Sequence, residues 1–128
     1  MPNQIIYTPN APEPIGPYSQ AVLANGILYV SGQIPINPAN GSLVEGDTKA
    51  EATQVMENIK AILEAAGASF NDVIKATIFL SDMALFATVN EVYGSYFTQH
   101  FPARETVAVK HLPKYVNVEI SVLVNMVP

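Results

Sequence analysis

Apolar and polar residues alternate along several short runs of this 128-residue chain, a pattern typical of β-strands with one buried face. The expected strands cover residues 5–8, 21–24, 27–32, 73–80, 105–109 and 117–124. Asn25-Gly26 separates the second run from the third, and two such residues between apolar runs predict a tight hairpin. Prolines and glycines predict ordered loops over residues 11–20 and 35–46.

Two other stretches repeat apolar residues at helical spacing. The first helix is expected to begin at Thr48, where Thr48-Lys49-Ala50-Glu51 fits a capping box, and to end at Gly67. The second is expected to begin after Ser81-Asp82 and to stop before Pro102. Its apolar stripe consists of Phe86, Val89, Tyr93, Tyr96 and Phe97. This order of elements predicts a single α+β domain over residues 1–128, with both helices on one face of a mixed sheet.

Composition narrows the classes of protein. The chain has no cysteine, which excludes disulfides and thiolate chemistry. Its first residues, MPNQIIYTPN, lack the pattern of a signal peptide, and no apolar run approaches the roughly 20 residues of a membrane helix. We therefore expect a cytoplasmic protein that does not bind membranes. The net charge of -5, with six basic residues spread thinly, argues against a nucleic-acid partner.

Charged residues make up 13% of the chain, compared with about 25% in ordinary globular domains. So small a protein has much surface for its volume and normally covers it with charge. One interpretation is that a face is buried against another copy of the chain. The alternative is a monomer that is merely apolar for its size.

Few residues offer chemistry. Two histidines, His100 and His111, do not form a transition-metal site on their own, and no phosphate-binding loop or nucleophile elbow is found. We therefore expect neither a metal nor a cofactor. Lys75 falls in an expected strand on the same side as Thr77, so we interpret it as solvent-facing rather than as a Schiff-base amine.

Arg104 and Glu119 are the two strongest candidates. Arg104 is the only arginine, and its planar fork of donors suits a carboxylate, although a surface ion pair would explain it equally simply. In the last strand Glu119 shares a face with Asn117, Ser121 and Leu123. That face either contacts water or lines a cleft in which the pKa of the carboxylate is raised enough for proton transfer.

Two more residues have open interpretations. Tyr18, in the Pro-Tyr-Ser segment, is either a wall or donor of a site or a core tyrosine. Asn90 interrupts the stripe of the second helix, and its amide either needs an internal partner or faces water.

Several specific motifs occur together in one chain. They are I-G-P-Y-S-Q (15–20), S-G-Q-I-P (31–35), T-V-N-x-x-Y (88–93), P-A-R (102–104), L-P-K (112–114) and V-E-I (118–120). In this order and at this spacing, the chain resembles the RidA/YjgF family over nearly its full length.

The resemblance implies a chorismate-mutase-like α+β fold and a homotrimer with pockets at the subunit interfaces. It also implies a small-molecule substrate: enamine or imine intermediates such as 2-aminoacrylate and 2-aminocrotonate, hydrolysed to 2-keto acids and ammonia without a cofactor. Arg104 would bind the substrate carboxylate, and Glu119 would position water and move protons. The remaining pocket residues implied by the motifs are Tyr18, Ser31, Gly32, Phe86 and Asn90.

Three positions depart from the family pattern. Glu105 and Thr106 stand where many members have a small residue and then cysteine, and Ser121 replaces a second glutamate. Strand alternation should point Glu105 away from Arg104. None of these changes removes a proposed catalytic group, but they leave the substrate range open.

Two other functions are compatible with the sequence. One is a trimeric regulatory or chaperone-like module that binds small carboxylates without turnover; it would need Arg104 but not Glu119. The other, a chorismate mutase, rests on fold analogy alone, and a single arginine is few for a dianionic substrate.

Overall fold

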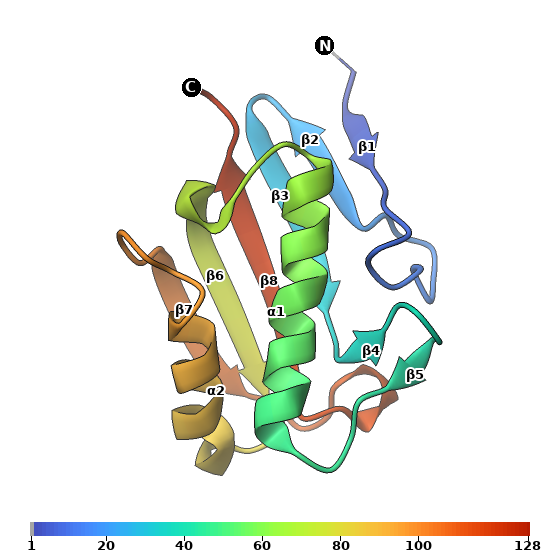
Figure 1. Cartoon of the computed structure of the whole chain (residues 1–128), viewed down its shortest axis with the longest axis vertical. Helices are drawn as coiled ribbons and strands as arrows, with labels where there is room; N and C mark the ends of the chain where they lie inside the picture. The colour runs from blue at the N-terminus through green and yellow to red at the C-terminus, as the bar shows by residue number, and fades with distance from the viewer. Residues whose placement is uncertain (1) are drawn as a thin grey trace.

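The computed structural model describes residues 2–128 and places two helices on one face of a six-stranded mixed sheet (Figure 1). The strands lie in the order β1-β2-β3-β8-β6-β7, and all neighbours are antiparallel except the parallel pair β6 and β7. Their bounds are β1 Gln4–Ile6, β2 Ala21–Ala24, β3 Ile27–Gln33, β6 Val73–Leu80, β7 Ala103–Ala108 and β8 Val118–Asn125. The predicted α+β arrangement is confirmed.

The hairpin between β2 and β3 forms as expected. Asn25 and Gly26 take φ values of 51° and 80°, the left-handed region that such a two-residue turn requires. The loop predicted over residues 35–46 is only partly a loop, because it contains a small hairpin. That hairpin pairs β4 (Ile36–Asn37) with β5 (Ser42–Leu43).

The first strand ends at Ile6, two residues earlier than predicted. Gln20 explains the early end, because its buried side chain bonds the backbone of Thr8. Its Oε1 accepts from Thr8 N at 2.8 Å and its Nε2 donates to Thr8 O at 3.0 Å. The same Nε2 donates to the Pro12 carbonyl at 2.9 Å, which fixes the loop that leads to Tyr18.

Helix α1 (Thr48–Ala65) begins where predicted, but the predicted capping box is wrong. Asp47 is the N-cap, and its Oδ1 accepts from Lys49 N at 3.1 Å. Glu51 turns inward instead: it is 4% exposed, and both carboxylate oxygens accept from Asn117 Nδ2, at 3.1 and 3.2 Å. Gly67, with a φ of 80°, ends the helix as expected.

Helix α2 (Phe86–Gly94) is shorter than predicted. Asp82 caps a separate 3-10 turn, Met83–Leu85, by accepting from Ala84 N at 2.8 Å. The helix ends at Gly94, well before Pro102, so the predicted stop is wrong. Beyond this end, Tyr96 and Phe97 still join the core through contacts with the Phe70 ring.

The main core lies between the sheet and the two helices. Helix α1 packs over β3 and β8, and α2 packs beside it (Figure 1). The side chains that β8 contributes to this core alternate along the strand: Val118, Ile120, Val122 and Val124. In β6, Ala76, Ile78 and Leu80 alternate in the same way, and Val73 joins them across a shift in the β6–β8 register between Val73 and Lys75. None of the helices within residues 2–128 is long and apolar enough to span a membrane.

The opposite face of the sheet has no helix over it in the part of the chain that the structure describes. Lys75 lies on this face and pairs with Glu105 at 3.1 Å, with Thr77 beside them, as predicted for a lysine outside the core. Tyr29, on the same face, leaves 49% of its surface exposed. We call this surface the open face.

Candidate active site in two halves

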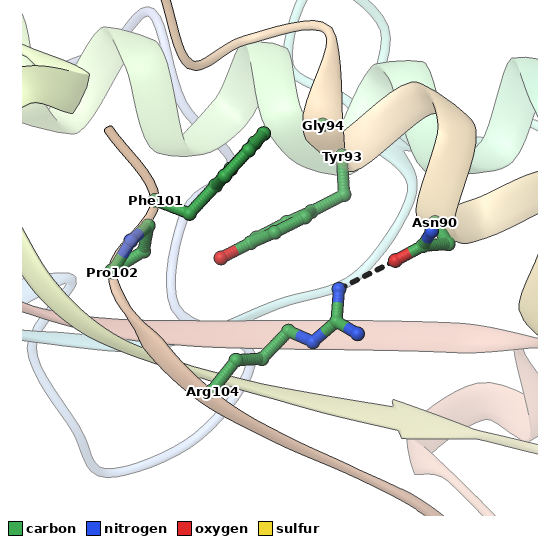
Figure 2. A pocket seen from close by; sticks show the side chains of 6 residues that line it. All are labelled: Asn90, Tyr93, Gly94, Phe101, Pro102 and Arg104. Carbon is green, nitrogen blue, oxygen red and sulfur yellow. Dashed lines mark hydrogen bonds between the residues drawn. The ribbon is translucent and has the colours of Figure 1, made fainter. Parts of the chain in front are cut away.

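Arg104 lies in the edge strand β7 and points toward helix α2 (Figure 2). Its Nη1 donates to Asn90 Oδ1 at 2.6 Å, and its guanidinium lies 5.5 Å from the ring centre of Phe86 and 5.2 Å from that of Tyr93. The hydrogen bond and the two rings hold the fork in place. Asn90 therefore has a partner within the chain, and its side chain is also exposed to solvent.

A cavity of about 410 Å³ adjoins this arginine. It is lined by Asn90, Tyr93, Gly94, Phe101, Pro102 and Arg104. Figure 2 shows the Tyr93 ring between Phe101 and the guanidinium. One fixed cation among aromatic side chains suits a small anion with an apolar end.

Glu119 lies in a second cavity, of about 390 Å³. Its lining is Ile15, Tyr18, Ser31, Gly32, Ile34, Pro113 and Glu119. Burial raises the pKa of Glu119 above the usual range of a glutamate, and no cation opposes this shift. A carboxylate in these surroundings can take a proton from water and return it to a nearby group.

Gly32 makes room for this carboxylate. A Cβ at residue 32 would come within 2.5 Å of Glu119 Oε2, so a side chain there would displace the carboxylate from this position. The β3–β8 register also shifts between Val30 and Gln33, which locally bends the strand.

The remaining predicted residues of this half form its rim. Ser31 Oγ donates to the Ser19 carbonyl at 2.6 Å, so the serine fixes the loop that carries Tyr18. The Tyr18 hydroxyl accepts from Ile15 N at 3.2 Å, and its ring is 46% exposed. Tyr18 is therefore a wall of the cavity and not a core tyrosine.

The two halves lie on opposite faces of the sheet. Arg104 is paired with Ala76 of β6, which belongs to the main core, whereas Glu119 is paired with Phe79. Positions 76 and 79 are three residues apart on one strand, so their side chains leave opposite faces. Glu105 pairs with Lys75 on the open face, and thus points away from Arg104 as expected.

The predicted residues thus fall into two groups, with Arg104, Phe86 and Asn90 in one and Tyr18, Ser31, Gly32 and Glu119 in the other. From the sequence, Tyr93 was expected only in the apolar stripe of the second helix, and Phe101 was not expected at the site. Asn90 and Tyr93 are three residues apart, which places both on one side of a helix. This spacing could have indicated that Tyr93 lies beside Asn90 at the site. No three side chains suited to hold a metal gather anywhere in residues 2–128.

Comparison with known proteins identifies the fold. The family model described as Endoribonuclease L-PSP matches residues 8–126. A RutC family protein of Pyrococcus horikoshii is 57% identical over 94% of this chain and 95% of its own. The Bos taurus protein named 2-iminobutanoate/2-iminopropanoate deaminase is 50% identical over 94% of this chain and 88% of its own.

Solved structures agree. The structure of RidA from a Psychrobacter species superposes with a TM-score of 0.91 at 47% identity, over 95% of this chain and 98% of the other. Escherichia coli TdcF, solved with bound serine, superposes with a TM-score of 0.90 at 43% identity, over the same shares. A mixed six-stranded sheet with two helices is thus the architecture of the YjgF and L-PSP structures. The chain belongs to the RidA/YjgF/L-PSP (RutC) family.

Proposed function

We propose that this protein hydrolyses enamine and imine intermediates such as 2-aminoacrylate and 2-aminocrotonate to 2-keto acids and ammonia. It does so as a homotrimer in which each site combines the Arg104 cavity of one subunit with the Glu119 cavity of its neighbour. The observation that carries the proposal is the separation of the two halves by the sheet. One chain cannot bring both residues to one small substrate, whereas two copies can.

Each half supplies one requirement of the reaction. Arg104 binds the substrate carboxylate through its fork, which fixes the position of the adjacent imine carbon. Glu119 accepts a proton from the water that attacks this carbon. It then returns a proton to nitrogen as the carbinolamine collapses to the ketone and ammonia. Such a reaction uses orientation and one proton-transfer group, without a metal or cofactor.

Three further observations support the proposal. The Glu119 carboxylate has a pKa that burial raises, as suits a group that gains and loses protons. The open face carries half-exposed apolar residues such as Tyr29 and Val107, which a neighbouring subunit would cover. Finally, the similar Bos taurus protein carries the name of an imine deaminase.

A coupled assay tests the reaction. A serine dehydratase generates 2-aminoacrylate, and addition of this protein should accelerate the appearance of pyruvate. No acceleration at micromolar protein would contradict the proposal and favour a module that binds small carboxylates without turnover. Dialysis against EDTA should leave the activity unchanged.

Sedimentation equilibrium tests the assembly. At low micromolar concentration the protein should have about three times the mass of one chain. A monomer under these conditions would contradict a site shared between subunits.

A further inference from the structure

Two buried side-chain oxygens have no hydrogen-bond partner within residues 2–128: the hydroxyl of Tyr93 and Oγ1 of Thr106. Buried polar atoms in folded proteins are nearly always paired, because an unpaired one destabilises the fold. Such an atom at a cavity therefore suggests that a ligand supplies its partner.

Of these two hydroxyls, only that of Tyr93 belongs to a residue that lines the Arg104 cavity. Tyr93 is 3% exposed, and its ring lies against the guanidinium, 5.2 Å from ring centre to the Arg104 carbon. In Figure 2 its oxygen lies at the end of the ring nearest Pro102, on the side away from Asn90. Helix α2 holds Tyr93 and Asn90 on one side, and Asn90 bonds the Arg104 guanidinium. The Tyr93 hydroxyl and the guanidinium are therefore fixed in position relative to each other.

The hydroxyl is suited to donate a hydrogen bond. Burial raises the pKa of Tyr93, and the opposing effect of the Arg104 charge is the smaller one, so the phenol stays protonated at neutral pH. Asn90 occupies one N–H of Arg104 and leaves the other guanidinium donors free. A carboxylate can accept several hydrogen bonds, so it can use the fork and the phenol together.

We infer that the Tyr93 hydroxyl is a further ligand-binding group, which donates a hydrogen bond to a carboxylate oxygen of the 2-keto or 2-imino acid held by Arg104. This inference rests on the proposed function for the identity of the ligand. It assigns to Tyr93 a role beyond packing in the core, since packing needs only the ring. The hydroxyl reduces stability in the empty protein and is compensated when the ligand binds.

Calorimetric titration of Tyr93→Phe with pyruvate tests the inference. The variant keeps the ring and its contact with Arg104 but lacks the donor. Affinity should fall about ten- to a hundredfold, as expected for the loss of one hydrogen bond to a charged group. The denaturant midpoint should stay unchanged or rise, because a buried unpaired hydroxyl has been removed.

Two control variants test whether the effect on pyruvate binding is specific to a hydroxyl in the Arg104 cavity. Thr106→Val removes the other unpaired hydroxyl, which lies outside the cavity lining, and should bind pyruvate like the wild type. Tyr96→Phe removes a hydroxyl that donates to Glu57 at 2.7 Å. It should lower the denaturant midpoint and leave pyruvate affinity unchanged.

Three outcomes would overturn the inference. Unchanged pyruvate affinity in Tyr93→Phe would mean that water or nothing pairs with the hydroxyl. A reduced association of subunits in sedimentation would place its partner on a neighbouring chain. Absence of pyruvate binding by the wild type would remove the ligand itself. Because the titration needs no turnover, an inactive protein that still binds pyruvate through Arg104 and Tyr93 would refute the deaminase proposal alone.

Discussion

The Arg104 and Glu119 cavities are similar in volume, about 410 and 390 Å³, but they differ in what surrounds their charged side chain. The arginine is held by a hydrogen bond from its guanidinium to Asn90 and by two aromatic rings, which together fix the position of the guanidinium. The glutamate has only burial acting on its pKa, which disfavours its charged state.

The difference suggests a division of tasks. A group that binds an anion should keep its charge throughout, whereas a group that moves protons should change its charge easily. Variants of each half test whether the two halves are as separate in function as they are in position.

The largest effect is expected for Glu119→Gln. The amide has nearly the same shape but cannot act as a base, so turnover should fall about 10²–10⁴-fold. Pyruvate should still bind, because Arg104 is intact. The coupled assay and calorimetry measure the two effects. Glu64→Gln, the same exchange at an exposed position of α1, serves as the control and should behave like the wild type.

Arg104→Lys should show a different defect. The single ammonium cannot reproduce the planar fork, so pyruvate affinity should fall about ten- to a hundredfold. Turnover should fall as well, since a loosely held substrate presents its imine carbon poorly. Lys60→Arg, the reverse exchange at an exposed site, is the control. Pyruvate binding as in the wild type would contradict the role of the arginine.

Mixing these two variants tests whether the site is shared. When equal amounts of Arg104→Lys and Glu119→Gln chains are unfolded together and reassembled at random, about one quarter of all sites should combine an intact arginine with an intact glutamate. Activity should rise toward that fraction of the wild-type value. If both residues acted within one chain, the mixture would stay as inactive as its components.

The smallest effect concerns pH. Turnover should decrease as pH falls through the raised pKa of Glu119, because the carboxylate form is the base. Stability should respond in the opposite direction. Between the unfolded and folded pKa values of this group the folded state binds more protons, so the free energy of unfolding decreases as pH rises through that window. Glu119→Gln should lack both dependences, as activity profiles and denaturation at several pH values would show.

Local signals in the sequence predicted the elements well where one short segment decides the structure. Asn25-Gly26 and Gly67 succeeded because left-handed backbone conformations select such residues directly. The capping box failed because Glu51 has a distant alternative. Its carboxylate bonds Asn117, 66 residues further along the chain, and no local pattern reveals that partner.

The candidate site was predictable as a set of residues but not as an arrangement. Motifs brought Arg104 and Glu119 into one pocket, and strand alternation was correct for each strand separately. Their separation depends on β6 lying between β7 and β8 in the sheet. The pairing of each of these strands with β6 decides which residues of β7 and of β8 have side chains on the same face. That order follows from long-range pairing, and the spacing of residues along the chain does not contain it.

The close approach at Gly32 has a consequence for how relatives of this protein can diverge. A Cβ at residue 32 would approach the Glu119 carboxylate to 2.5 Å, so the residue at position 32 determines where this carboxylate can lie. Exchange of the glycine in one step would displace the acid, and loss of the acid would free the glycine to vary. We therefore expect relatives with a larger residue at this position to keep the fold but to lack the proposed reaction. The residue at this position would then indicate whether a relative carries out the proposed reaction.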